Sequence, residues 1–189
     1  MNFSTPSNAF RLVVLASLLA LLSTPSAHAG TGPGPGAGDA APPALGTDIK
    51  GEPVNLSQYV GKAVIVTFWA TWCSYCLKEL PILENIQNKA GKAHMQVIAV
   101  NTESREVFRK ASRVMKSLSL MVTHDTGSKA FTAYGGTGLP HMAIIGRDGN
   151  IIRIYQGHDE SSLHAIVKDV NQALMMPVQE KATETETEK

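Results

Sequence analysis

The sequence predicts an α/β domain in which helices flank a central mixed β-sheet. Two observations lead to this fold class. Short runs rich in β-branched residues alternate with amphipathic helical stretches, which is typical of parallel strands joined by helices. The last two runs are joined by "RDGN", whose Asp148-Gly149 pair is a strong hairpin signal and adds an antiparallel pair to the sheet. The chain has 189 residues, 43% of them hydrophobic and 17% charged, which is ordinary for a globular protein.

Each strand is expected where an apolar run is bounded by turn residues. A small N-terminal β-hairpin extension is predicted first, within "TDIKGEPVNLSQYVGK", where Lys50-Gly51 separates two short alternating runs. The later strands are expected at "AVIVTFWA" (63–70), "MQVIAV" (95–100), "LMVTHD" (120–125), "HMAIIG" (141–146) and "IIRIYQG" (151–157). The first of these runs is apolar throughout and predicts a buried central strand.

Helices are expected from Ser74 onward, over 104–118, over 128–135, and from Asp159 or Ser161 to about residue 176. Pro81 falls inside the first helix and is expected to kink it, because proline lacks a backbone donor. The side chains expected to face the core include Leu77, Leu80, Leu83 and Ile86, then Val107, Phe108, Ala111, Val114, Met115 and Leu118, and finally Leu163, Ile166, Val167, Val170 and Leu174.

Residues 1–29 are typical of a secretory signal peptide. Arg11 precedes an apolar run, Leu12–Leu22, and Ala27-His28-Ala29 supplies small residues for cleavage. The run is shorter than the roughly 20 residues that span a bilayer. An uncleaved membrane anchor is the alternative. The sequence therefore predicts export across a membrane.

The rest of the chain divides by composition. Residues 30–44 are rich in Gly, Pro and Ala and predict a flexible linker. Residues 45–176 form the expected domain, and residues 177–189 predict a polar, disordered tail. Removal of residues 1–29 removes one of the 17 basic residues and leaves 16 against 16 acidic ones. The sequence contains no block of basic residues of the kind that predicts binding to nucleic acid.

The chain's two cysteines, Cys73 and Cys76, lie at the junction of a predicted buried strand and a helix. Unpaired amide groups in the first helical turn stabilise a thiolate there. Cys76 lies one turn further on, so the pair can close a disulfide around only two residues. Such a small loop restricts the unfolded chain little, which favours a redox couple over a structural brace. A tetrahedral metal site would need two further ligands, and no pair of histidines has the short spacing of a zinc finger.

Several motifs together resemble the thioredoxin superfamily, and within it the periplasmic TlpA/ResA-like thiol–disulfide oxidoreductases. "FWATWCSYC" resembles the family's Trp-Cys-x-x-Cys site, and "GTGLPHMAIIGRDGNIIRIYQG" its cis-proline segment with the final hairpin. The resemblance implies a thioredoxin-like fold with catalytic Cys73 and Cys76, supported by Trp72 beside them. It also implies that Pro140 is the cis-proline and that its loop receives a partner polypeptide.

The chain departs from the family pattern at two positions. Tyr75 replaces the usual proline before the second cysteine and resembles the disulfide isomerases DsbC and DsbG. Thr67 stands where thioredoxin has a buried acid, so a proton acceptor for Cys76 must come from elsewhere. Glu79, in "CLKELP", matches an acidic residue of ResA-like members and is the candidate. His141, which follows Pro140, is expected to be a strand residue near the site.

The resemblance implies an enzyme of the bacterial periplasm or its membrane surface that reduces protein disulfides. No cofactor and no metal is expected, and the single CxxC pair argues for a monomer. Its substrates would be the cysteines of apocytochrome c or of copper sites, and a membrane-bound electron donor of the DsbD/CcdA kind would reduce it again. A disulfide oxidant or isomerase is the alternative that Tyr75 favours. A copper metallochaperone that binds the metal through Cys73, Cys76 and a histidine is an alternative of another class.

Overall fold

The computed structural model describes residues 34–157 and 162–178. The chain divides into two units, Met1–Gly30 and Thr31–Lys189, and every described residue belongs to the second. The predicted signal peptide and residues 179–189 of the predicted tail lie outside the described residues. Within the described residues, no helix has the length and apolar character needed to cross a membrane.

One seven-stranded sheet forms the centre of the domain, with strand order β2-β1-β5-β4-β3-β6-β7. The strands are β1 (Ala44–Thr47), β2 (Pro53–Asn55), β3 (Ala63–Trp69), β4 (Met95–Asn101), β5 (Met121–His124), β6 (His141–Ile145) and β7 (Ile151–Gln156). Strand β3 pairs parallel with β4 and antiparallel with β6, so the sheet is mixed, as the sequence predicted. β3 is buried along its whole length because it has neighbours on both edges and helices or loops on both faces.

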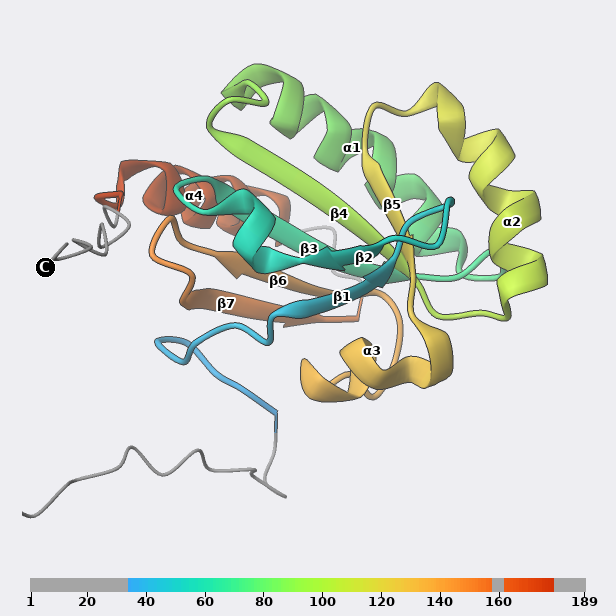
Figure 1. Cartoon of the computed structure of the whole chain (residues 1–189). Helices are drawn as coiled ribbons and strands as arrows, with labels where there is room; N and C mark the ends of the chain where they lie inside the picture. The colour runs from blue at the N-terminus through green and yellow to red at the C-terminus, as the bar shows by residue number, and fades with distance from the viewer. Residues whose placement is uncertain (1–33, 158–161, 179–189) are drawn as a thin grey trace, which may run out of the picture. The chain divides into compact units, whose positions relative to one another are not determined.

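Helices cover both faces of this sheet (Figure 1). They are α1 (Ser74–Ala90), α2 (Arg105–Val114), α3 (Lys129–Ala133) and α4 (Ser162–Met175). Short 3-10 turns lie at Leu56–Tyr59, Met115–Ser117 and Thr126–Ser128. Side chains of α1 and α4 pack with Ile65 and Ile144 in one core cluster, whereas α3 packs with Val66 and Phe68 in another. α1 and α4 therefore lie on one face and α3 on the other.

Four apolar residues predicted to face the core are instead substantially exposed. Leu77 is 42%, Val114 77%, Leu163 41% and Val167 41% exposed. In α4 the buried set is Ile166, Asp169, Val170 and Ala173. Asp169 can be buried because its carboxylate accepts hydrogen bonds from Arg153 Nε at 2.5 Å and the Tyr155 hydroxyl at 2.7 Å, both on β7. Helical periodicity alone could not reveal these partners on another element.

Part of the segment predicted as a linker packs on the domain. Backbone hydrogen bonds join Gly38 and Asp39 to Ile151, and the Ala41 amide to the Gly149 carbonyl at 3.0 Å. The Tyr134 hydroxyl donates to the Pro42 carbonyl at 2.9 Å. Ala41 itself is buried in the core. The compact domain thus includes residues before the predicted boundary at 45, because this stretch meets its hydrogen-bonding needs on β7 and α3 rather than in water.

Candidate active site

Cys73 and Cys76 are joined by a disulfide at the N-terminus of α1, with sulfurs 2.02 Å and Cα atoms 5.3 Å apart. Cys73 is the N-cap of the helix, and its sulfur accepts a hydrogen bond from the Cys76 amide at 3.2 Å. Both side chains are almost fully buried, at 6% exposed for Cys73 and 1% for Cys76. After reduction, a thiolate on Cys73 would meet the same unpaired amide groups and the positive end of the helix dipole.

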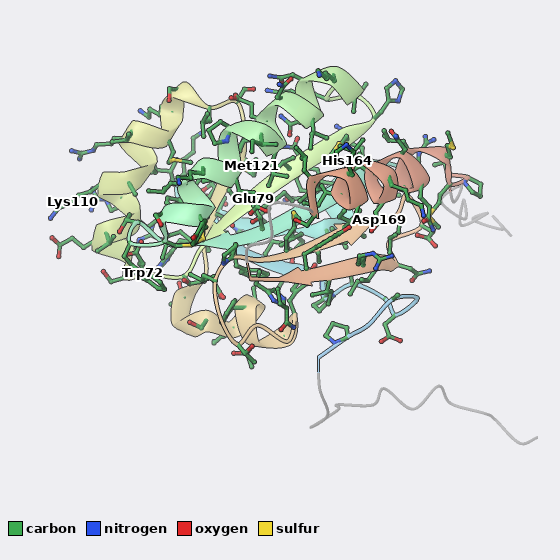
Figure 2. All side chains as sticks on the ribbon, turned by 180° about the vertical axis from the view of Figure 1, so that it is seen from behind. Trp72, Glu79, Lys110, Met121, His164 and Asp169 are labelled. Carbon is green, nitrogen blue, oxygen red and sulfur yellow. A yellow bond between two sulfur atoms is a disulfide. The ribbon has the colours of Figure 1, made fainter. Side chains whose placement is uncertain are left out.

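The two aromatic residues predicted at the site lie on the protein surface. Trp72 is 71% exposed and Tyr75 is 49% exposed. The Lys78 ammonium lies 5.7 Å from the centre of the Tyr75 ring. Trp69, by contrast, is a core residue and is 1% exposed. Figure 2 shows Trp72 at the edge of the molecule, beside the start of α1. An exposed indole next to a disulfide offers apolar contact area to a docked polypeptide.

Glu79 lies one turn after Cys76 on α1 and is partly buried over the sheet (Figure 2). Burial raises the pKa of its carboxyl from 4.5 to about 7, although a hydrogen bond with the Thr67 side chain opposes the shift. Its Oε2 atom has no hydrogen-bond partner among the described residues. A carboxyl with this pKa can accept or release a proton near neutral pH. The Thr67 hydroxyl therefore contacts the Glu79 carboxyl, although a hydroxyl cannot itself serve as the base.

The Leu139–Pro140 peptide bond is cis, as the sequence predicted. Leu139 packs against the cluster that contains both cysteines, so this loop lies next to the disulfide. The Pro140 carbonyl accepts a hydrogen bond from the Gly157 amide at 2.8 Å, which ties the loop to the end of β7. The loop therefore forms one wall of the site and α1 forms another.

His141 lies on the sheet face opposite to α1. Its ring packs 5.7 Å from Phe68 and 5.8 Å from Phe131, and Nε2 contacts the Tyr134 carbonyl at 2.9 Å. Burial lowers its pKa, although the bond to Tyr134 opposes the shift. The sheet separates this imidazole from the sulfurs, so His141 is not placed to share a copper ion with them. In the part of the chain that the structure describes, no group of three potential ligands could hold a metal ion.

Glu103 also holds the site together and was missed by the sequence analysis. Its carboxylate accepts hydrogen bonds from the Thr71 amide at 2.6 Å and the Thr71 hydroxyl at 2.8 Å. The Asn101 side chain donates to the same carboxylate at 3.2 Å. Glu103 therefore fixes the loop that carries Trp72 and leads into Cys73. The available signal was its place just after the C-terminal end of a parallel strand, where polar side chains of neighbouring strands gather.

The site combines a disulfide at a helix N-terminus with a cis-proline loop, and a mixed central sheet carries both. These features together define a thiol–disulfide oxidoreductase of the thioredoxin superfamily. Comparison with known proteins agrees with that class. The model of the Redoxin family matches residues 36–174. This chain belongs to the Redoxin family and is a ResA-like member of the superfamily.

Individual relatives are consistent with this assignment. The thiol-disulfide oxidoreductase ResA of Bacillus subtilis is 30% identical over 130 residues, which cover 67% of this chain and 72% of that protein. ResA of Bacillus thuringiensis subsp. konkukian is 30% identical over 120 residues, 64% of this chain and 69% of that protein. A putative thiol:disulfide interchange protein DsbE from Chlorobium tepidum matches with a TM-score of 0.65 and 28% identity, over 74% of this chain and 99% of that one.

Proposed function

We propose that this enzyme reduces disulfides in exported proteins, with Cys73 as the attacking thiolate and Cys76 as the resolving thiol. The observation that carries the assignment of roles is the position of Cys73 at the N-cap of α1, where its sulfur already accepts an amide hydrogen bond. Cys76 is less exposed than Cys73. The sulfur that a substrate disulfide can reach first is therefore that of Cys73.

The reaction proceeds by two exchanges. The Cys73 thiolate attacks one sulfur of the substrate disulfide, which breaks that bond and releases the other sulfur as a thiolate. Cys76, after losing its proton, then attacks Cys73 Sγ in the mixed disulfide and releases the second substrate sulfur. The protein's two sulfurs become its disulfide and the substrate gains two electrons. The Cys76 proton and one proton from water convert the two substrate thiolates to thiols. Glu79 is proposed to accept the Cys76 proton, and the Pro140 loop to hold the substrate backbone.

The location and partners follow from the same proposal. An exported enzyme would work in the periplasm if its N-terminal signal is cleaved, or at the membrane surface if that segment stays as an anchor. A membrane-bound donor would return it to the dithiol form, because the periplasm has no thiol buffer. Cysteines of apocytochrome c or of copper sites are the proposed substrates. His141 lies on the far side of the sheet, so it is not the histidine that the copper metallochaperone alternative needs.

The equilibrium reduction potential of the Cys73–Cys76 couple tests the direction of electron flow. Titration against glutathione is expected to give a value near or below about −270 mV, that of thioredoxin, as a reductant requires. A value near about −120 mV, that of DsbA, would contradict the reducing role and favour the oxidant or isomerase that Tyr75 indicates. The Cys76→Ser variant is the control, since it cannot form the internal disulfide.

A further inference from the structure

The exposed face of α2 carries a concentration of positive charge that the redox chemistry does not use. Residues 105–116 contain five basic residues and one acid, whereas the whole chain has 17 basic and 16 acidic residues. Arg105, Arg109 and Arg113 follow one another at four-residue spacing and therefore form a stripe along the helix. Lys116, in the 3-10 turn that continues α2, extends it. These four residues are named the basic stripe.

The basic stripe makes no ion pair with an acid among the residues that the structure describes. All four of its side chains are exposed. The one acid on α2, Glu106, pairs with Lys110 at 2.8 Å, outside the stripe. Within residues 34–157 and 162–178, no carboxylate lies within ion-pair distance of the stripe. Val114 lies beside it and is 77% exposed. Four basic side chains without an ion pair create a positive potential that attracts an oppositely charged partner.

The basic stripe begins next to the redox site. Glu103, whose carboxylate binds the Thr71 amide and hydroxyl, directly precedes Ser104, the N-cap of α2. The loop that carries Trp72 therefore lies against the start of the helix. Lys110 and Trp72 lie toward the same side of the molecule (Figure 2). A polypeptide that places its disulfide at Cys73 and continues past Trp72 would reach the first turn of α2.

The apolar face of α2 is buried in the domain, which favours a protein partner over a lipid surface. Phe108 and Met115 face the domain core, so the helix has no wide apolar face left to enter a bilayer. The exposed face offers charge with one apolar side chain. A surface of this kind suits another folded or extended polypeptide with complementary charge.

We propose that the basic stripe is a docking surface for polypeptides that carry acidic residues beside their disulfide. The inference rests on the proposed function, because it specifies the partners of that same site. Long-range attraction between the stripe and the acidic segment raises the rate of encounter, and the aligned complex brings the substrate disulfide to Cys73.

Reduction of matched disulfide peptides tests this proposal. The peptides share one internal disulfide and differ only in whether glutamate, glutamine or lysine flanks it. The reduced full chain is expected to react with the glutamate peptide at least about tenfold faster than with the lysine peptide at about 0.01 M salt. At about 1 M salt, where the Debye length is about 3 Å, the ratio of the two rate constants is expected to approach one.

The Arg109→Glu/Arg113→Glu variant is expected to invert the ratio at low salt. The Lys92→Glu/Lys168→Glu variant makes the same change in net charge at exposed positions away from the stripe, and is expected to keep the wild-type ratio. Equal ratios in the two variants would overturn the proposal, since the preference would then follow net charge alone. If the first variant does not fold, the salt dependence of the wild-type ratio still tests the attraction, and a ratio that salt leaves unchanged would overturn it.

Reduction of the glutamine peptide separates this proposal from the proposed function. If that neutral peptide is not reduced at all, the reductase assignment has failed. If it is reduced as fast as the glutamate peptide at low salt, the enzyme is a reductase and the docking surface is wrong. Binding to phosphatidylglycerol vesicles without any preference among the peptides would also overturn the proposal, in favour of a lipid surface.

Discussion

Burial of Glu79 between α1 and the sheet raises the pKa of its carboxyl to about 7. In the unfolded chain this carboxyl ionises near pH 4.5. Between pH 4.5 and about 7 it therefore stays protonated in the folded protein but is ionised in the unfolded chain. Stability therefore falls as the pH rises from 4.5 to 7, and the cost of ionising the buried carboxyl is fully present above pH 7. That cost is on the order of 3 kcal/mol.

Replacement of Glu79 by glutamine is expected to remove this pH dependence. Urea unfolding of the oxidised protein should show Glu79→Gln more stable than wild type above pH 7, by up to about 3 kcal/mol, with the difference gone below pH 4.5. In single-turnover measurements from a Cys73 mixed disulfide, the release step is expected to lose its inflection near pH 7 and to slow by about a hundredfold. The matched control is Glu52→Gln on an exposed turn. An unchanged pH profile in Glu79→Gln would exclude Glu79 as the proton acceptor.

At the scale of elements, the site depends on a contact between two loops, one before α1 and one before α2. The two bonds from Thr71 to the Glu103 carboxylate join these loops. Hydrogen bonds to a charged acceptor contribute about 1.5–3 kcal/mol each, more than neutral ones. The loop that leads into Cys73 is therefore held by the end of the neighbouring strand as well as by α1.

The Glu103→Gln variant is expected to weaken this contact, because an amide oxygen is a weaker acceptor and its nitrogen accepts no hydrogen bond. We expect a loss of about 1–2 kcal/mol in the free energy of unfolding. The Thr71 amide of the folded protein should also exchange its hydrogen faster. The control Glu106→Gln removes an exposed acid three residues away, whose ion pair stabilises by less than about 1 kcal/mol. Equal losses in both variants would show that the loop contact is unimportant.

At the scale of the whole molecule, the N-terminal segment contributes to the fold by bonding to the start of the last strand. Residues 38–41 bond to Ile151 and Gly149 at the start of the edge strand β7 and in the turn before it, and Pro42 accepts from Tyr134. Edge strands left open are prone to pair with other chains. Through Tyr134 the segment is also connected to the cis-proline loop. The hydroxyl of Tyr134 bonds to Pro42, and its carbonyl contacts His141, the residue after Pro140.

Truncation is expected to reveal the contribution of this segment. A chain that begins at Ala44 loses these bonds and the buried Ala41 side chain. Compared with a chain that begins at Gly34, it should unfold at lower urea, with a loss of at least about 2 kcal/mol in free energy. Identical midpoints for the two chains would mean that residues 34–43 act only as a linker.

The position of the site was predictable from the sequence because its signals are local. A cysteine pair after an apolar run, with one cysteine at the start of a helix, specifies the N-cap geometry within four consecutive residues, Cys73 to Cys76. The cis-proline was implied by the family resemblance of a short segment, and the strands were placed along the chain from short apolar runs. The exposure of Val114, Leu163 and Val167 was not predicted, because periodicity identifies a helical face without identifying what covers it.

The sequence by itself determined the fold class, the redox pair, and the elements on which they lie, since these depend on neighbouring residues. The tertiary structure decided which polar residues support the site. Glu103 meets Thr71 across 32 positions of the chain, and Glu79 meets Thr67 from another element. It also placed His141 on the far face of the sheet, although the residue adjoins Pro140 in sequence. Successive residues of a strand point to opposite faces, so adjacency along a strand and proximity in space are different properties.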